Sequence, residues 1–281
     1  MSDALLPPEM AQRAEEIGAR KAAMPILQTV MLGVLAGAFI GLGGQFSIVA
    51  STGAAAVPWG LGRVAAGLCF SLGLGLVVVG GAELFTGNNL LAMAWASRRI
   101  TTRALLRNWA LVYAGNLVGA VGTAALVALS GVWRAADGGP GRVALDLALA
   151  KVQLPFLEAV VRGVLCNALV CLAVWLSFSA RSTSDRLAAV VLPVAAFVAM
   201  GFEHSVANMY FVPLALFLRA LAPAPFWTTI GKRTDDYAAI DWGSFLGGNL
   251  LPVTLGNILG GTVLVAAVYW VVYLRAARPV A

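Results

Sequence analysis

The chain places its only histidine, His204, directly after Glu203 in the stretch GFEHSVANMY. The eleven residues before this stretch, VVLPVAAFVAM, are apolar. An imidazole has an ordinary pKa of about 6.5, so it can donate, accept or exchange a proton near neutral pH. A carboxylate and an imidazole are both costly inside an apolar segment, and ionisable residues kept there usually serve a function.

A second carboxylate stands in a related stretch, GAELFTGNN at 81–89, which shares the pattern G-x-E-x-x-x-x-N with GFEHSVANM at 201–209. The identical positions pair Gly81 with Gly201, Glu83 with Glu203 and Asn88 with Asn208. The histidine has no counterpart, because Leu84 takes its place. A further pair of similar stretches, NWALVYAGNLVGA at 108–120 and NLLPVTLGNILGG at 249–261, follows in the same order. The chain therefore contains an internal repeat.

The composition defines the class of protein in which these residues lie. Of 281 residues, 60% are hydrophobic and 11% are charged, against about 45–50% and about 25% in soluble domains. We predict an all-α membrane protein. The net charge is +6. We interpret the basic residues as setting the membrane topology and contacting lipid, rather than as binding nucleic acid. The cysteines, Cys69, Cys166 and Cys171, lack metal-ligand spacing, so we expect neither a metal site nor a cofactor.

Apolar runs of about 20 residues predict membrane-spanning helices. Six candidates are found, at about 26–50, 61–96, 105–131, 156–180, 187–219 and 246–274. The second and fifth contain the two related polar stretches, so we expect both helices to be broken near the midplane. Three spans in each half require the halves to be inverted. Broken helices at matching positions of inverted repeats indicate a substrate site.

The predicted organisation has three parts. Residues 1–24 form a cytoplasmic amphipathic helix, and 25–275 form one transmembrane domain with repeats at about 25–131 and 150–275. Residues 276–281 form a cytoplasmic tail. The loops assigned to the inside carry more Lys and Arg than those assigned to the outside, so both termini are expected in the cytoplasm.

Each polar residue of the spans has a structural and a functional interpretation. Glu83 and Glu203 could clamp unwound backbone by accepting its N–H groups, or they could take part in transport. Because a carboxylate exposed to the pore would repel anions, we favour the clamp. For His204 we favour a role in the pore over that of a satisfied core residue. Asn167 could orient His204 or a permeant, or could equally join two helices. Arg162 and Glu158 form an i,i+4 pair, and Arg162 is expected to face a neighbouring subunit or the outer interface.

These stretches resemble the signatures of a known family of membrane proteins. The chain is similar to the formate/nitrite transporter family, and most similar to its bacterial formate channels. The stretches that carry the resemblance are AELFTGN, GFEHSVANMYFVP, KVQLPFLEAVVRGVLCNALVCLAVWLSFSAR, RNWALVYAGNLVGA and NLLPVTLGNILGG. The resemblance runs from about residue 25 to 275 in the right order. It implies an aquaporin-like bundle of six helices in two inverted halves, assembled as a homopentamer in the bacterial inner membrane and in contact with membrane lipids.

The resemblance also implies roles for single residues. His204 would be the central pore residue, contacted by Asn167, with Thr86 across the pore on a loop that moves with pH. Lys151 and Glu203 would attract the anion and organise the surroundings of the histidine, although Lys151 could also be a solvated loop lysine. Hydrophobic constrictions would bracket this site, and by position they involve Phe70, Leu74, Leu84, Phe85, Phe197 and Phe202. Gly87, Asn88 and Asn89 depart from the small hydroxyl residues common in formate channels, which puts loop gating in doubt.

The expected function is passage of small monovalent weak-acid anions, most of all formate, with His204 giving pH-dependent or proton-coupled transport. Nitrite or hydrosulfide could instead be the main substrate. A water or ammonia channel is a further alternative, although the chain lacks Asn-Pro-Ala and a second histidine. A membrane enzyme is disfavoured because no cofactor motif is present, and a purely structural protein because broken helices would carry strain for no purpose.

Overall fold

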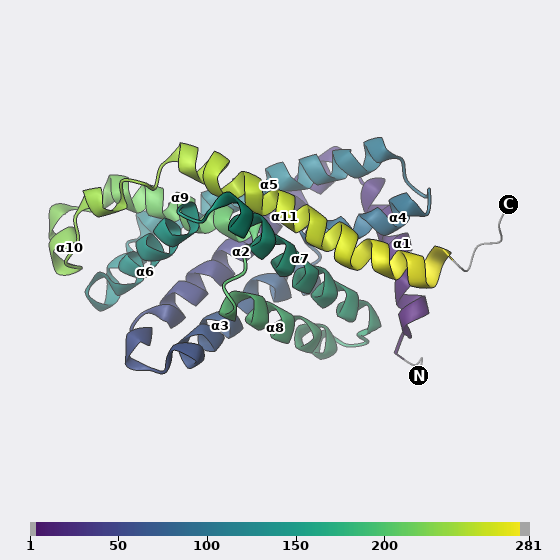
Figure 1. Ribbon diagram of the computed structural model, residues 1–281, viewed down its shortest axis with the longest axis horizontal. Coiled ribbons are helices and arrows are strands. Elements are labelled where there is room, and N and C mark those ends of the chain that lie inside the picture. The colour runs from purple at the N-terminus through teal and green to yellow at the C-terminus, as the bar shows by residue number, and fades with distance from the viewer. Residues whose placement is uncertain (1–3, 276–281) are drawn as a thin grey trace.

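The computed structural model describes residues 4–275, within which every regular element is helical (Figure 1). The α-helices are α1 (Pro7–Ala22), α2 (Ile26–Ser51), α3 (Trp59–Gly80), α4 (Leu91–Ala96), α5 (Thr102–Ser130), α6 (Ala135–Val152), α7 (Phe156–Ser179), α8 (Thr183–Ala199), α9 (Ser205–Leu221), α10 (Ala224–Thr229) and α11 (Leu251–Leu259). Short 3₁₀ helices occur at Ala54–Ala56, Gly87–Leu90, Val132–Arg134 and Thr234–Tyr237. The last long helix combines α11 with π-helical segments at Ser244–Leu250, Gly260–Ala267 and Trp270–Arg275.

Five helices of the described residues are long and apolar enough to cross a membrane: α2, α3, α5, α7 and the helix Ser244–Arg275. They correspond to five of the six predicted spans. The remaining predicted span, 187–219, is divided into α8 and α9 of 17 residues each, so its crossing as one unit stays a prediction. The predicted tail at 276–281 lies outside the described residues.

α6 was not predicted from the sequence. Its first turn contains a bend at Ala136, Asp137 and Gly138, which all have positive φ. Its sequence is too polar for a span, and the prediction treated this region as an outer loop. The helix matters for the site because it carries Lys151 in its last turn.

Both predicted helix breaks are present, and each begins at a glycine. Gly81 ends α3 with φ 75°, and Gly201 follows α8 with φ 74°. A left-handed residue is a common helix terminator because it lets the following N–H groups return to the last turn. The N–H of Ala82 donates to the carbonyl of Val77 at 3.0 Å, and Phe202 donates to Phe197 at 3.0 Å. An added Cβ at these φ values is strained, which explains why both stretches begin with glycine.

The two broken helices lie against each other in opposite directions. An added Cβ on Gly67 would meet the backbone of Ala195, and one on Gly75 would meet Leu187, so residue numbers rise along α3 as they fall along α8. α2 packs on α3 and α5, and α7 packs on α8 and α11. The same packing scheme is therefore used twice.

Close glycine contacts hold α2 against α5. An added Cβ on Gly119 would overlap the carbonyl oxygen of Val34, whereas a Cβ on Gly122, three residues further along α5, would meet open space. We expect Gly119→Ala to reduce the free energy of unfolding by about 1–3 kcal/mol, the usual cost of an overpacked contact. Thermal unfolding in detergent measures this effect. Gly122→Ala is the matched control and should leave the unfolding temperature unchanged or higher, and equal losses in both variants would contradict the packing explanation.

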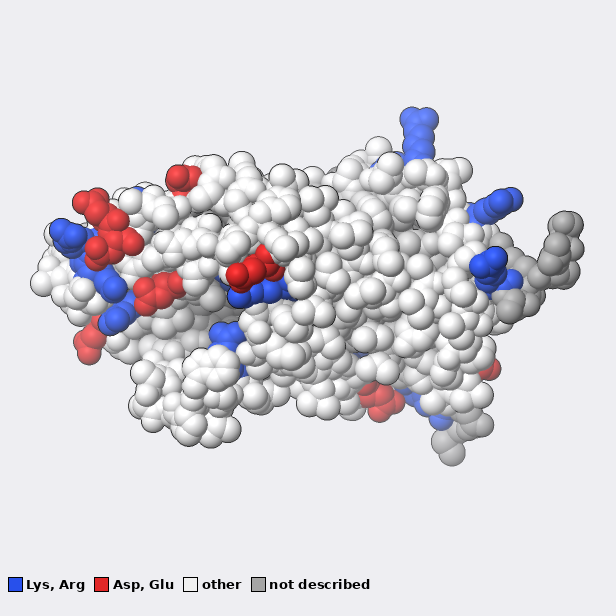
Figure 2. All heavy atoms as spheres, in the orientation of Figure 1, with Lys and Arg blue, Asp and Glu red and all other residues white. Residues whose placement is uncertain are grey.

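The charged residues gather toward the two ends of the molecule's long axis. α1 and the end of the last helix lie at one end, and α6 and α10 lie at the other (Figure 1). Figure 2 shows acidic and basic side chains gathered toward these ends, with a mostly uncharged surface between them apart from a mixed group near its middle. This distribution suits a chain whose middle faces lipid.

Candidate functional site

The glutamate of the first break belongs to a buried polar cluster. Glu83 is 3% exposed, and its carboxylate pairs with the Nζ of Lys21 at 3.0 Å. The side-chain amide of Asn88 donates to Glu83 at 2.7 Å and to Asn108 at 3.0 Å. Lys21 also donates to the Oδ1 of Asn88 at 2.8 Å. The amide of Asn108 donates to the backbone carbonyl of Lys21, which closes the cluster.

The second break has the same cluster, built from a different part of the chain. Glu203 pairs with the Nζ of Lys151 at 2.8 Å. Asn208 donates to Glu203 and to Asn249, both at 2.7 Å, and Asn249 donates to the backbone carbonyl of Lys151. Lys151 is 8% exposed, so it is a buried helix residue rather than a solvated loop lysine. One difference separates the clusters: the Oδ1 of Asn208 has no hydrogen-bond partner among the described residues.

The unwound backbone is held by two asparagines and not by the glutamates. Asn116 accepts from the N–H of Phe85 and donates to the carbonyls of Gly33 and Glu83. Asn257 does the same at the second break, where it accepts from Ser205 and donates to Gly163 and Glu203. The expected glutamate clamp on backbone N–H groups is thus corrected, because the carboxylates bind lysine and asparagine side chains instead.

His204 joins the two breaks. Its Nδ1 accepts from the backbone N–H of Ala207 at 3.0 Å, and it is the N-cap of α9. Its Nε2 lies 2.9 Å from the Oγ1 of Thr86. Because a backbone N–H always donates, the proton of the neutral ring must be on Nε2, which therefore donates to Thr86. Phe197 stacks on the imidazole with 5.9 Å between ring centroids.

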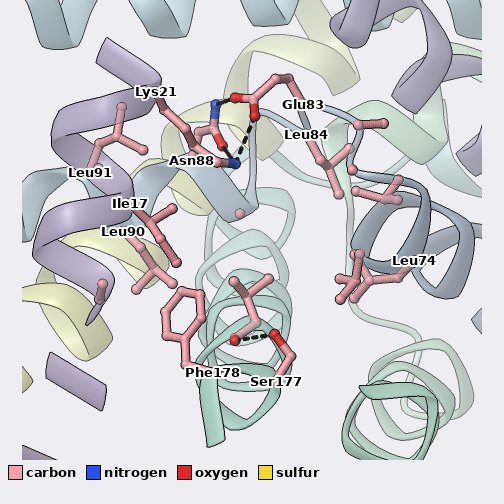
Figure 3. Close-up of a pocket in the computed structure, with 18 of the residues that line it drawn as sticks. Ile17, Lys21, Leu74, Glu83, Leu84, Asn88, Leu90, Leu91, Ser177 and Phe178 are labelled. Atoms are coloured by element: carbon pink, nitrogen blue, oxygen red, sulfur yellow. Dashed lines mark hydrogen bonds and ion pairs between the residues drawn. The ribbon is translucent and has the colours of Figure 1, made fainter. Parts of the chain in front are cut away.

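Two cavities approach this pair from opposite ends of the molecule. The first, about 250 Å³ in volume, is named the α1 cavity because Lys21 of α1 lines it together with Glu83 and Gly87 (Figure 3). The second, about 370 Å³, is named the α6 cavity because Lys151 of α6 lines it together with His204. Gly87, the neighbour of Thr86, lines the α1 cavity and His204 lines the α6 cavity, so the Thr86–His204 hydrogen bond joins the linings of the two cavities.

Most predicted constriction residues line these cavities. Leu74 and Leu84 line the α1 cavity, and Phe70, Phe197 and Phe202 line the α6 cavity. Phe85 lies outside the lining of both and packs edge-on against Tyr113 and Trp109.

Other polar residues of the spans have structural partners. The amide of Asn167 donates to the carbonyl of Asn257 at 2.6 Å instead of to His204, so it joins α7 to α11. Arg162 pairs with Glu158 at 2.9 Å and lines the α6 cavity. Arg63 also lines that cavity and donates to the carbonyls of Val198 and Ala199 at the end of α8.

The sequence interpretation missed Lys21, although a signal was present. Lys21 begins the stretch KAAMP and Lys151 begins KVQLP, so both lysines precede a proline by four residues. Each proline is followed by a long apolar helix. Extending the internal repeat to these stretches would have paired the lysines.

These features define the class of protein. Long apolar helices, two helix breaks and two cavities that meet at a buried hydrogen-bonded pair are the features of a multi-pass membrane protein with a path for a small solute. The family model for the formate/nitrite transporter matches residues 8–271. The chain belongs to the formate/nitrite transporter family.

Individual relatives agree with this assignment. The chain is 48% identical to the formate channel FocA of Escherichia coli strain K12 over 273 residues, which cover 97% of this chain and 96% of the relative. It is 41% identical to the formate channel FocA of Haemophilus influenzae, over 93% of this chain and 92% of the relative. A solved structure described as a pentameric formate channel with formate bound superposes with a TM-score of 0.85 at 42% identity, covering 89% of this chain and 98% of that one.

Proposed function

We propose that the protein is a channel for formate and similar small weak-acid anions, and that His204 is its central pore residue. The observation that carries the proposal is the position of the Thr86–His204 pair between two cavities that are each lined by a lysine. The relatives named as formate channels support formate as the substrate.

The lysines give each cavity an attraction for anions. Lys21 and Lys151 are each bound to a glutamate, so neither cluster has a large net charge. Each ammonium nevertheless has three N–H groups and can offer one to an anion that enters. Arg63 and Arg162 add positive charge to the α6 cavity, and such charge raises the local concentration of anions.

The apolar side chains between the cavities oppose a bare anion, because a charge without partners is costly to bury. His204 reduces this cost by donating the hydrogen of Nε2 to formate in place of Thr86. Protonation of Nδ1 would break the hydrogen bond from Ala207, so we assign His204 the role of a hydrogen-bond donor. Formate and a proton from the solution on the entry side then cross together as formic acid hydrogen-bonded to His204, and both are released on the far side, which makes uptake fall as the pH rises. The passage involves no chemical conversion.

A relative supports the proposed assembly, and the charge of the loops supports the proposed topology. We propose a homopentamer with one path in each subunit, in accord with the pentameric formate channel. Residues 25–275 form the transmembrane domain of a cell inner-membrane protein with both termini in the cytoplasm and its outer surface in contact with lipid.

Uptake into proteoliposomes tests the proposal. Formate, nitrite and hydrosulfide are compared at equal inward gradients across a pH range. We expect formate flux to exceed the other two and to rise as the pH falls. If nitrite or hydrosulfide flux were dominant, the proposed path would stand and the proposed substrate would be wrong. Passage of water or ammonia without any anion would overturn the function.

A further inference from the structure

The α1 cavity has apolar walls in addition to its polar cluster. Figure 3 shows Lys21, Glu83 and Asn88 together at one end of the cavity, with Leu90 and Ile17 on one side and Leu74 on the other. Phe178 lies at the end opposite the polar cluster. Ligand pockets for organic molecules combine mostly hydrophobic walls with a few placed polar groups. The α1 cavity has this character.

Two further cations line the same cavity, Arg13 of α1 and Arg186 of α8. Both are exposed, and among residues 4–275 neither forms an ion pair with a carboxylate. Glu83, the only acidic residue of the lining among residues 4–275, is already paired with Lys21. The cavity therefore has an excess of positive charge beside apolar surface.

Formate uses only part of this environment. A single carboxylate group can satisfy a cation, but it has no hydrocarbon to place against Leu74, Leu90 or Phe178. A longer monocarboxylate satisfies both features, because its tail removes apolar wall from water while its head binds a guanidinium. Arginine holds carboxylates well because its N–H groups match both oxygens.

We propose that the α1 cavity binds straight-chain monocarboxylates of about four carbons or more, and that these block the path. The head binds Arg13 and Arg186, and the tail lies against Leu74 and Leu90. Leu74 is one turn of α3 from Phe70, which lines the other cavity, so the tail occupies space that formate must cross. This inference rests on the proposed function for its inhibitory consequence, but binding itself does not depend on it.

Formate exchange in proteoliposomes tests the block. Labelled formate is exchanged at equal concentrations on both sides, so that proton leakage caused by long acids has no effect. Carboxylates from butyrate to octanoate are added. We expect the concentration for half inhibition to fall by about fourfold for each added methylene, the affinity gain for burying one CH₂, until the cavity is filled. Alcohols of equal chain length control for partition into the lipid and should not inhibit.

Charge variants locate the site. The double variant Arg13→Gln/Arg186→Gln should raise the half-inhibitory concentration of octanoate by at least tenfold, with inhibition measured relative to the variant's own uninhibited formate exchange. Arg103→Gln, which removes an exposed arginine of α5 outside both cavity linings, is the matched control and should behave as the unmodified protein. Inhibition that is unchanged in the double variant would overturn the proposed site.

Calorimetric titration of octanoate into the protein in detergent separates this inference from the proposed function. Saturable binding that is weakened in the double variant supports the site even if formate does not pass. Formate exchange without octanoate binding, or without any dependence on chain length, overturns the inference and leaves the proposed function in place.

Discussion

Replacement of His204 by phenylalanine is expected to reduce formate uptake by about 10- to 100-fold, the factor that corresponds to loss of a hydrogen bond to a charged group. The imidazole is 3% exposed and is the residue whose Nε2–H points to Thr86 between the cavities. The phenyl ring retains the apolar contact with Phe197 but has no hydrogen to donate. Uptake into proteoliposomes at several pH values measures the effect, and the residual flux should lose its pH dependence.

A second substitution separates transport from folding. His204 also caps α9 through Nδ1, so His204→Phe should cost about 1 kcal/mol in unfolding free energy from the lost cap alone. Asparagine is a favoured capping residue but is too short to reach Thr86. His204→Asn should therefore retain stability and still lose flux. Uptake by His204→Asn at the unmodified level and with unmodified pH dependence would refute the role of the imidazole.

Lys151→Met is expected to produce the largest loss of stability, about 3–5 kcal/mol, because it leaves the carboxylate of Glu203 buried without its partner. Glu203 is 4% exposed, and Asn208 can supply only part of the lost stabilisation. Lys21→Met should cost less, because the side chain of Lys21 is 27% exposed and water can reach Glu83 more readily. Thermal unfolding of the purified variants in detergent gives the ranking.

The double variant Lys151→Met/Glu203→Gln tests the cause of this loss. Removal of both charges together should recover most of the stability, since neither group is then left unpaired. Formate uptake should remain below the unmodified level, because the attraction from the α6 cavity is gone. If the double variant were as unstable as Lys151→Met, the loss would come from packing of the lysine chain and not from an unpaired charge.

The helix breaks could be predicted because their causes are local. Gly81 and Gly201 are followed at fixed spacing by Glu and Asn in otherwise apolar runs, and short-range geometry makes these glycines helix ends. The partners of the glutamates could not be found in this way. Lys21 is distant in sequence from Glu83, and Lys151 from Glu203, so only folding brings each pair together.

Asn116 and Asn257 illustrate a different limit of prediction from the sequence. Asn116 and Asn257 were recognised as equivalent positions of a repeat, but their contacts were not predicted. Each forms three hydrogen bonds to backbone groups of two other segments, and such contacts depend on the packing of α2 on α5 and of α7 on α11. Phe85 shows the same limit at a single residue, because the orientation of a side chain in unwound backbone is set by its tertiary contacts.

The paired lysine–glutamate–asparagine clusters have an electrical consequence. An ion approaching from either end meets an ammonium, a carboxylate and amides in nearly the same arrangement. The potential along the path is therefore close to mirror-symmetric, with His204 as the main departure from symmetry. A path with such a profile has no preferred direction: formate fluxes under equal and opposite gradients are similar, and the prevailing gradient decides whether the cell exports or recovers its anion.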